Sequence, residues 1–299
     1  MWLEWPEKCF RVDAEALRTL RALVPAGSRI VRARSEAAFL RALPGATHAI
    51  VWNFKSEWFA RAPNLKVLAT PAAGRELVPE RGPAGVRIHF GHFHGGVMSE
   101  TVAAFVLAWA RGFFALAAHR ASGAADARWP RTWLADRCRE VAGTKAVVLG
   151  YGNIGRAIGA KLAALGVDVV GVTRSRPARA AELRAADWLI LALPSTTGTD
   201  GLVDAAFLRR LPKTCVLVNV GRGNAVDEAA LAAALKAGRL AGAYLDVRRD
   251  EPSGTVPLFG ANAAELDGLA NCIVSPHSSA FSPAYVASCF KELKDDGCL

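Results

Sequence analysis

Short apolar runs alternate with segments of helical spacing along the N-terminal third of this chain. Four of these runs have the length and composition of β-strands, namely 28–33, 48–52, 66–70 and 86–90. Between them, Ala14–Leu23 and Glu36–Leu43 carry apolar residues at the spacing of a helix face. Strands that alternate with helices predict a parallel sheet with helices on both faces.

From Lys145 onward the alternation becomes regular. Six further apolar runs predict strands, at 145–149, 167–172, 187–193, 215–220, 241–247 and 272–275. Six such strands complete a doubly wound dinucleotide-binding domain. We therefore predict an α/β protein with two doubly wound parallel-sheet domains. One is a Rossmann NAD(P)-binding domain over residues 96–282, and the other is a smaller flavodoxin-like domain over residues 1–95 and 283–299, on which a helix at 284–293 packs.

The segment between the two strand-rich regions predicts one long helix over Ser99–Ala118. Its most apolar part, Val102–Ala118, is near the lower length limit of a membrane span and contains Arg111, which favours a buried helix and no membrane. Residues 121–140 are polar and contain Gly, Pro and Trp. They are either an arm that packs on a partner subunit or a surface loop.

The composition narrows the class of protein. A hydrophobic content of 52% indicates a globular chain, and the formal net charge is +10. The arginines are dispersed, without a helix-turn-helix, zinc finger or basic tail, so we predict no nucleic-acid partner. The charge indicates either a solvated basic surface or a field that attracts anionic ligands.

The cysteines and the N-terminus bear on location. The six cysteines are scattered and none forms a Cys-x-x-Cys pair, which is typical of a reduced, cytoplasmic protein. The first residues lack the basic start and apolar core of a secretory signal. We expect a cytoplasmic location.

A glycine fingerprint directly follows the predicted strand at 145–149 and opens a helical segment. Gly150 permits a tight turn, Gly152 lets the backbone approach a pyrophosphate, and Gly155 lets helix and strand pack closely. The N-terminus of the helix offers free N–H groups and partial positive charge to the phosphates. The predicted nucleotide site also includes the intervening residues Asn153 and Ile154.

The end of the next strand bears on the choice of nucleotide. An acid there would bind the ribose 2′-hydroxyl of NAD, but the position holds Thr173. Arg174, Ser175 and Arg176 follow, and together they could bind a 2′-phosphate. We therefore predict that NADP(H) is preferred and that NAD(H) is possible. A solvated basic turn is the alternative.

Several ordered motifs in the second half resemble those of the D-isomer-specific 2-hydroxyacid dehydrogenases. They are Val218–Glu228, Leu245–Val247 with Asp250–Pro252, Ser275–His277 and the loop Leu193–Thr199. The similarity runs from about Pro63 to Pro283 and is looser over the N-terminus.

This resemblance implies a catalytic set. Arg222 would clamp the carboxylate of a 2-keto acid and polarise its keto oxygen. His277 would donate a proton to that oxygen as hydride arrives at the carbon. Glu251 would hydrogen-bond His277 and raise its pKa. Taken singly, each residue also has a structural explanation: a surface arginine, a loop acid and a core histidine.

The resemblance also implies supporting roles. Backbone N–H groups near Ala73 and Gly74 would hold the substrate carboxylate in a cleft between the domains, and closure would exclude water. Asp246 would meet the nicotinamide carboxamide. Cofactor contacts are further expected at Pro194, Thr199 and Val220.

Two features depart from the family pattern or stand outside it. Arg248 replaces a usual aromatic, and either adds positive charge near the site or points to solvent. His89, His92 and His94 form a cluster, with His92 and His94 on one side if the segment is extended. No nearby Cys or acid completes a ligand set, so we predict no metal. The resemblance implies that this stretch runs toward the active-site cleft, where a histidine could contact the substrate or only line the cleft.

The sequence thus favours an NADPH-preferring reductase of small anionic 2-keto acids, such as glyoxylate or hydroxypyruvate, that forms D-2-hydroxy acids. A second possibility is an NAD-dependent enzyme for another substrate, such as phosphoglycerate or phosphite. A third is a non-catalytic nucleotide sensor. The family resemblance also leads us to expect a homodimer, with its interface at the 99–118 helix and the Trp-containing arm.

Overall fold

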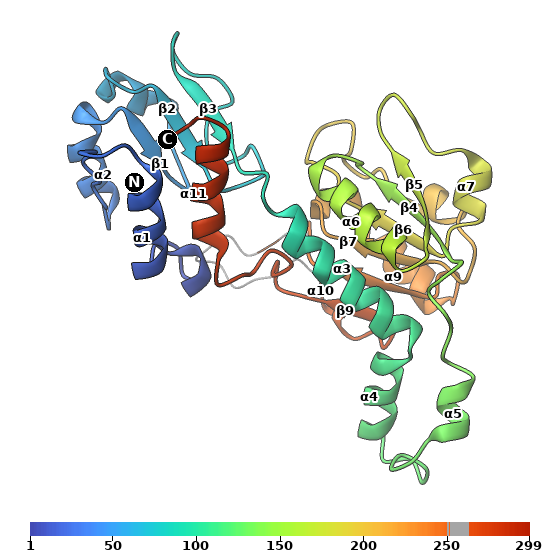
Figure 1. Ribbon diagram of the computed structural model, residues 1–299. Helices are drawn as coiled ribbons and strands as arrows, with labels where there is room; N and C mark the ends of the chain where they lie inside the picture. The colour runs from blue at the N-terminus through green and yellow to red at the C-terminus, as the bar shows by residue number, and fades with distance from the viewer. Residues whose placement is uncertain (250, 252–262) are drawn as a thin grey trace. The chain divides into compact units, whose positions relative to one another are not determined.

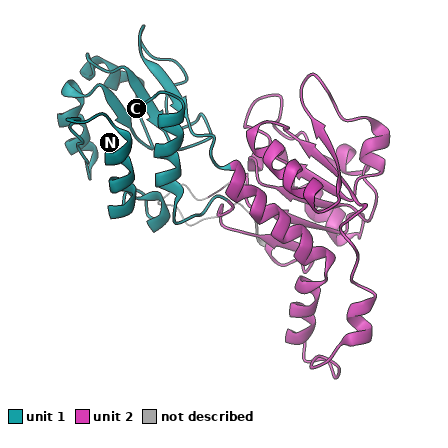
Figure 2. Ribbon diagram, in the orientation of Figure 1, with its two compact units in different colours: residues 1–94, 280–299 teal, residues 95–279 magenta. Residues whose placement is uncertain are grey.

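The computed structural model describes residues 1–249, 251 and 263–299. Asp250 and Pro252, which belong to one of the motifs above, lie outside the described residues. The chain divides into two compact units, residues 1–94 with 280–299 and residues 95–279 (Figure 2). Each unit has its own parallel sheet with helices, so the predicted fold class is confirmed. The assignment of these units to substrate and nucleotide binding stays a prediction.

The first unit contains a three-stranded parallel sheet in the order β1-β2-β3. Its strands are β1 (His48–Ile50), β2 (Val67–Thr70) and β3 (Arg87–Phe90). Its α-helices are α1 (Ala14–Leu23), α2 (Glu36–Ala42) and α11 (Tyr285–Asp295), with short 3-10 turns at 8–10, 43–45 and 56–61. These elements confirm three of the four predicted strands and both predicted helices.

The strand predicted at 28–33 is wrong. The segment runs beside the N-terminus, where the Met1 amino group donates to the Val31 carbonyl oxygen at 2.8 Å and Ala33 N donates to the Met1 carbonyl oxygen at 2.9 Å. Trp2 in turn forms a single parallel bridge with Val51. The two segments thus lie where the first two strands of a flavodoxin-like sheet would lie. They are not strands because a single bridge and isolated hydrogen bonds, rather than a continuous ladder, connect them.

The C-terminal helix α11 belongs to the first unit, and it packs against α1 (Figure 1). Its residues Cys289, Phe290 and Leu293 are fully buried in a core that also contains Leu3 and Leu20. Burying a side chain the size of Phe or Leu stabilises the fold by about 1.5–3 kcal/mol. The chain's two ends are therefore held together by one core, as predicted for the 284–293 helix.

The second unit contains a six-stranded parallel sheet in the order β5-β4-β6-β7-β8-β9. The strands are β4 (Lys145–Leu149), β5 (Asp168–Val172), β6 (Trp188–Leu191), β7 (Val216–Asn219), β8 (Gly242–Leu245) and β9 (Cys272–Val274). The helices that accompany them are α6 (Asn153–Ala164), α7 (Ala180–Arg184), α8 (Ala205–Leu208), α9 (Glu228–Lys236) and α10 (Ala263–Asp267), with a 3-10 turn at 223–225. All six predicted strands are confirmed. The four residues of β6 and of β7 are all buried, which explains their unbroken apolar sequence.

The single long helix predicted over 99–118 is wrong. The structure has α3 (Gly95–Ala110) and α4 (Phe113–Ala121), bent by 61° at the break between them. Gly112 lies at the break with φ of 68°, a left-handed conformation that ends a helix and that residues with a side chain rarely adopt. A short helix, α5 (Arg131–Ala135), lies within the polar segment that follows.

Among the described residues, no single helix is long and apolar enough to cross a membrane. By length and composition alone, α3 and α4 together could do so, as a pair that is bent at the break between them.

Candidate active site

The predicted site residues of the second unit lie in loops that follow the strands of its sheet. The chain passes from β4 outward to β5 and then crosses back to β6 on the other side of β4. This reversal creates a topological switch point, where ligands of doubly wound sheets bind at the carboxyl ends of the strands. The loops after β4 and β6 flank the switch point, and those after β7, β8 and β9 follow along the same edge.

The glycine fingerprint has the geometry of a nucleotide cradle. Gly150 has φ of 90°, and a Cβ there would lie 2.5 Å from the Ala192 carbonyl oxygen. A Cβ on Gly155 would collide with the Gly150 carbonyl oxygen, whereas a Cβ on Gly152 would meet nothing within 4 Å among the described residues. The first and third glycines are therefore needed for packing, and the second leaves the backbone open to a ligand. These residues and the N-terminus of α6 fit a pyrophosphate.

Tyr151 adds a support that the sequence did not reveal. A Cβ on Gly171 of β5 would overlap the Tyr151 ring, and a Cβ on Gly159 of α6 would lie 2.7 Å from the Tyr151 hydroxyl oxygen. The ring thus occupies the space that two glycines leave between helix and strand. That two glycines make room for one aromatic ring is evident only from the tertiary structure.

The basic turn after β5 is less uniform than expected. Arg176 donates to the Glu182 carboxylate at 2.8 Å and to the Gly171 carbonyl oxygen at 3.1 Å, so part of its charge is neutralised. The side-chain oxygens of Thr173 and Ser175 are 3.1 Å apart. Arg174 is exposed and makes no hydrogen bond or ion pair with the described residues. The two arginines are therefore not equivalent, because Arg176 is held by Glu182 and Gly171.

Arg222 projects from a turn that is held on both sides. A Cβ on Gly221 would lie 2.6 Å from the Leu193 backbone, and a Cβ on Gly223 would collide with the Arg248 carbonyl group. The Asn219 amide donates to the Arg222 carbonyl oxygen at 3.1 Å and accepts from Gly221 N at 3.1 Å. Close backbone approach therefore explains both glycines of the Gly-Arg-Gly motif. It places Arg222 between the loops that follow β6 and β8.

His277 and Glu251 are brought together from two of these loops. The His277 Nδ1 and Glu251 Oε2 atoms are 2.7 Å apart, and the other Glu251 oxygen accepts from Arg248 N at 2.9 Å. His277 has φ of 52°, the one positive value of a non-glycine residue in the described part of the chain. Its backbone N donates to the Asp246 carbonyl oxygen at 2.9 Å and so helps to hold this strained conformation.

Glu251 and His277 shift each other's pKa in opposite directions. The hydrogen bond and charge of Glu251 raise the pKa of His277, although burial opposes this and the charge of Arg222 lowers it. Burial raises the pKa of Glu251, but the hydrogen bond from His277 and the charges of His277 and Arg222 outweigh it and lower the pKa overall. The His277 Nε2 has no hydrogen-bond partner among the described residues. The structure thus places an imidazole of raised pKa within the field of the Arg222 guanidinium.

The Asp246 carboxylate holds the loop that carries His277 by hydrogen bonds. It accepts from the Ser275 hydroxyl at 2.7 Å, Ser278 N at 2.9 Å and Ser279 N at 3.1 Å. With 1% of its surface exposed, Asp246 is a positioning residue for the loop that carries His277. Its expected contact with a carboxamide stays a prediction.

The other residues predicted to contact the nucleotide, Pro194, Thr199 and Val220, are fixed by hydrogen bonds to the backbone. The Thr199 hydroxyl donates to the Pro194 carbonyl oxygen at 2.7 Å, which closes the loop after β6 on itself. Val220 is buried, and its backbone N donates to the Leu191 carbonyl oxygen at 3.0 Å. Ala73 and Gly74 lie in the loop after β2, in the other unit, so their part in the site stays a prediction.

Arg248 does not point to solvent, contrary to one of the two expectations for it. Its side chain is 3% exposed and forms ion pairs with Glu228 at 2.9 Å and Asp267 at 3.2 Å. Burial alone would lower the pKa of Arg248, but these two acids raise it overall. Because its backbone N also binds Glu251, the arginine anchors the loop that carries the partner of His277.

The three histidines of the N-terminal cluster have different partners. His94 Nε2 lies 2.8 Å from the Tyr285 hydroxyl oxygen, whereas His89 and His92 both contact acids of α11. The condition under which His92 and His94 would share a side, an extended segment, is not met because the chain turns at Phe93–His94. No acid was expected near these histidines, but the fold brings Glu292 and Asp296, which are distant in sequence, into contact with His89 and His92.

Comparisons with known proteins identify the class that this sheet and site define. Residues 103–279 match the family model described as D-isomer specific 2-hydroxyacid dehydrogenase, NAD binding domain. The protein is thus an oxidoreductase with a nucleotide-binding domain. The chain belongs to the D-isomer-specific 2-hydroxyacid dehydrogenases, as the resemblance of its motifs indicated.

Individual relatives differ in what their names state. A glyoxylate reductase of Thermococcus kodakarensis is 30% identical over 243 residues, which cover 74% of this chain and 69% of that protein. A D-3-phosphoglycerate dehydrogenase of Mycobacterium tuberculosis is 33% identical over 247 residues, 75% of this chain but only 43% of that longer protein.

Solved structures agree on the fold. A D-isomer specific 2-hydroxyacid dehydrogenase of Lactobacillus delbrueckii in its NAD-complexed form has a TM-score of 0.79 at 18% identity, covering 95% of this chain and 93% of that one. A family member from Xanthobacter autotrophicus, in complex with NADPH and MES, has a TM-score of 0.71 at 26% identity, covering 99% and 94%.

Proposed function

We propose that this protein reduces small 2-keto acids of the glyoxylate or hydroxypyruvate type to D-2-hydroxy acids, with NADPH preferred over NADH. The observation that carries this proposal is the His277–Glu251 pair, at 2.7 Å, within the field of Arg222. A carbonyl reduction needs a proton donor, and a 2-keto acid needs a cation for its carboxylate. These three side chains supply both.

The roles follow from the chemistry of each group. The planar guanidinium of Arg222 suits a carboxylate and also draws electron density toward the keto oxygen. His277 gives its Nε2 proton to that oxygen, and Glu251 stabilises the imidazolium beforehand and holds the ring through Nδ1. Bound nucleotide would supply the hydride. In the reverse direction, neutral His277 takes the proton back from the hydroxyl group.

The preference for NADPH rests on the end of β5. An acid is absent at Thr173, and exposed Arg174 can pair with a 2′-phosphate, while Arg176 is partly neutralised by Glu182. A charge-assisted hydrogen bond to phosphate contributes about 1.5–3 kcal/mol, and exposure reduces that value. Replacement of Arg174 by Ala should therefore raise the KM for NADPH about five- to tenfold and leave the KM for NADH unchanged.

The test is NADPH and NADH oxidation measured in parallel with glyoxylate, hydroxypyruvate, pyruvate and phenylpyruvate. Turnover should be lost in His277→Ala, and the NADPH preference should shrink in Arg174→Ala. Arg184→Ala, an exposed arginine at the end of α7, is the matched control. Equal KM values for both nucleotides in the parent chain would refute the cofactor assignment alone, because the catalytic set would be unaffected.

The similarity to phosphoglycerate dehydrogenases supports a second candidate, an NAD-dependent enzyme for a phosphorylated hydroxy acid. NAD reduction with 3-phosphoglycerate, in the absence of 2-keto acid reduction, would favour it. Tight nucleotide binding without turnover on any substrate would instead favour a nucleotide-sensing protein.

We further propose a homodimer in the cytoplasm. Phe113 at 60% exposure and Trp129 at 82% are large apolar residues exposed on the α4–α5 arm, which supports a subunit contact there. A mass determination by light scattering tests it. All six cysteines are unpaired, which supports a reducing compartment.

A further inference from the structure

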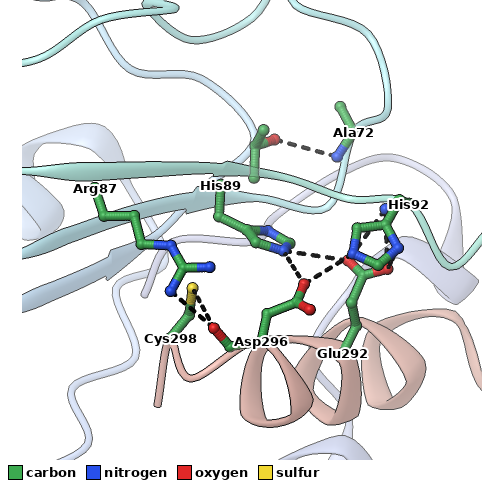
Figure 3. A network of polar contacts seen from close by, with 8 residues as sticks. Ala72, Arg87, His89, His92, Glu292, Asp296 and Cys298 are labelled. Atoms are coloured by element: carbon green, nitrogen blue, oxygen red, sulfur yellow. Dashed lines mark hydrogen bonds and ion pairs between the residues drawn. The ribbon is translucent and has the colours of Figure 1, made fainter.

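Four metal-ligating side chains meet in the first unit, outside the residues that the proposed reaction uses. His89 from β3 and His92 from the loop after it face Glu292 of α11 and Asp296, the residue directly after that helix (Figure 3). One ligand atom from each residue can be chosen so that all four lie within 4.8 Å of one another. Glu292 and Asp296 are four residues apart, a spacing that places both carboxylates on one face of the helix.

The contacts within the cluster are short and converge on the two carboxylates. The Nε2 atoms of His89 and His92 each lie 2.8 Å from the same Asp296 oxygen, Oδ2. His92 Nδ1 lies 3.0 Å from Glu292 Oε2, and His89 Nε2 lies 3.7 Å from Glu292 Oε1. Figure 3 shows both imidazole rings directed at the helix that carries the acids. Two imidazoles and two carboxylates therefore share one small volume.

Burial makes the charge of this cluster important. The side chains of His89 and Glu292 are each 6% exposed, while those of His92 and Asp296 are 46% and 31% exposed. Two carboxylates close together in such surroundings need a positive charge, because a buried uncompensated charge costs several kcal/mol. The nearby Arg87 guanidinium donates to the Asp296 main-chain oxygen at 2.8 Å rather than to either carboxylate. Besides the backbone N–H of His92, which donates to both Glu292 oxygens at 3.1 and 3.0 Å, compensation can come from protons on the cluster or from a bound cation.

We propose that His89, His92, Glu292 and Asp296 form a binding site for a first-row divalent metal ion, best represented by Zn²⁺. Two neutral imidazoles and two carboxylates carry a charge of −2, which a divalent ion neutralises. Nitrogen and oxygen ligands of this kind suit Zn²⁺ in tetrahedral geometry. Calcium and magnesium are disfavoured because they prefer oxygen ligands alone.

The geometry requires only local adjustment. Tetrahedral Zn²⁺ with bonds of about 2.0–2.1 Å places its ligand atoms about 3.3 Å apart. Hydrogen-bonded pairs at 2.8 Å must separate by ~0.5 Å, and the most distant pair must approach by ~1.5 Å. The half-exposed His92 ring lies where solvent and an ion can enter.

The ion would act as a structural clamp. His89 and Asp296 are 207 residues apart in sequence, and they join the N-terminal sheet to the C-terminal helix of the same unit. Metal binding to the folded protein stabilises it by mass action, because the ligands are not assembled in the unfolded chain. The inference does not depend on the proposed reaction, since none of the four residues has a role in it.

The experiment is calorimetric titration of ZnCl₂ into the full chain after removal of metal with a chelator. One saturable site per chain is expected, together with a Zn²⁺-dependent rise in Tm. Asp296→Asn and His92→Ala should each weaken binding at least about tenfold, since even indirect contacts to a metal commonly contribute 10–100-fold. Both replaced side chains are partly exposed, so we expect folded variants, which circular dichroism without metal verifies.

Two controls separate this site from others. His119→Ala removes a histidine that also lies 2.8 Å from a carboxylate, that of Asp126, in the other unit. His277→Ala removes the histidine of the candidate active site. Both variants should bind Zn²⁺ as the parent chain does. Absence of saturable binding, or binding that Asp296→Asn and His92→Ala leave unchanged, would overturn the proposal and leave a cluster held by protons alone.

Discussion

Replacement of Glu251 by Gln tests how the proposed proton donor is controlled. The change preserves the size of the side chain and removes the negative charge that lies 2.7 Å from His277 Nδ1. In the parent chain the Glu251 hydrogen bond and charge raise the pKa of His277. In the variant that cause is gone, while burial and the charge of Arg222, which both lower this pKa, remain.

The size of the effect on rate follows from the contact and its exposure. A hydrogen bond between charged groups contributes about 1.5–3 kcal/mol. The side chains of His277 and Glu251 are 51% and 32% exposed, so water screens the interaction and the lower half of that range applies. If this stabilisation is lost in the transition state, about 1.5–2 kcal/mol corresponds to a kcat for reduction that is about 10- to 30-fold lower.

The direction of the pH effect is also determined. Reduction requires protonated His277, so its rate is highest at low pH and falls as pH rises through the raised pKa of His277. In Glu251→Gln the fall should occur at lower pH. Oxidation requires neutral His277, so its rise with pH should begin at lower pH in the same variant.

The assay is kcat/KM for glyoxylate at saturating NADPH between about pH 5 and 10, a range that spans the ordinary pKa of histidine. Asp126→Asn is the matched control, because it alters a histidine–carboxylate pair of 2.8 Å that lies away from the site. Its profile should match that of the parent chain. An unshifted descending limb in Glu251→Gln would refute the reasoning, whatever the change in kcat.

Two further predictions concern the supports of the site. Gly223→Ala forces a Cβ into the Arg248 carbonyl group, so we expect a loss of about 1–3 kcal/mol in urea unfolding and a marked fall in kcat. Gly198→Ala, where none of the described residues lies within 4 Å of the added Cβ, should leave both unchanged, and equal stability of the two variants would contradict the close approach. Arg248→Met leaves the Glu228 carboxylate without its buried partner and should lower the free energy of unfolding by about 3–5 kcal/mol. The neighbouring exposed Arg249, replaced by Met, should lower it by less than about 1 kcal/mol, and similar losses in both would show that burial of the pair does not matter.

Much of the fold could be predicted from local sequence. Strands such as β6 and β7 are buried on both faces, so their apolar runs identify them without knowledge of their neighbours. The predictions were wrong at two segments where the burial of apolar residues does not by itself determine the secondary structure. Residues 28–33 are apolar enough for a strand but lack a partner that could continue a ladder. The break between α3 and α4 depends on the left-handed conformation of Gly112, which glycine permits but does not require.

The site divides in the same way. The roles of Gly150 and Gly155 could be predicted because close backbone approach tolerates no side chain, and that constraint is visible as a motif. The neutralisation of Arg176 by Glu182 and the burial of Arg248 were not predictable, because the sequence around an arginine does not indicate whether its side chain is exposed or paired.

The sequence by itself therefore determined the two parallel sheets, the nucleotide cradle and the identity of the candidate catalytic residues. Only the tertiary structure decided which charges face which partners. It paired the buried Arg248 with Glu228 and brought His89 against Asp296, across 207 residues of chain. The physical reason is that periodicity and glycine motifs record local constraints of burial and backbone conformation. Contacts between distant side chains arise from packing and leave no mark in the neighbouring sequence.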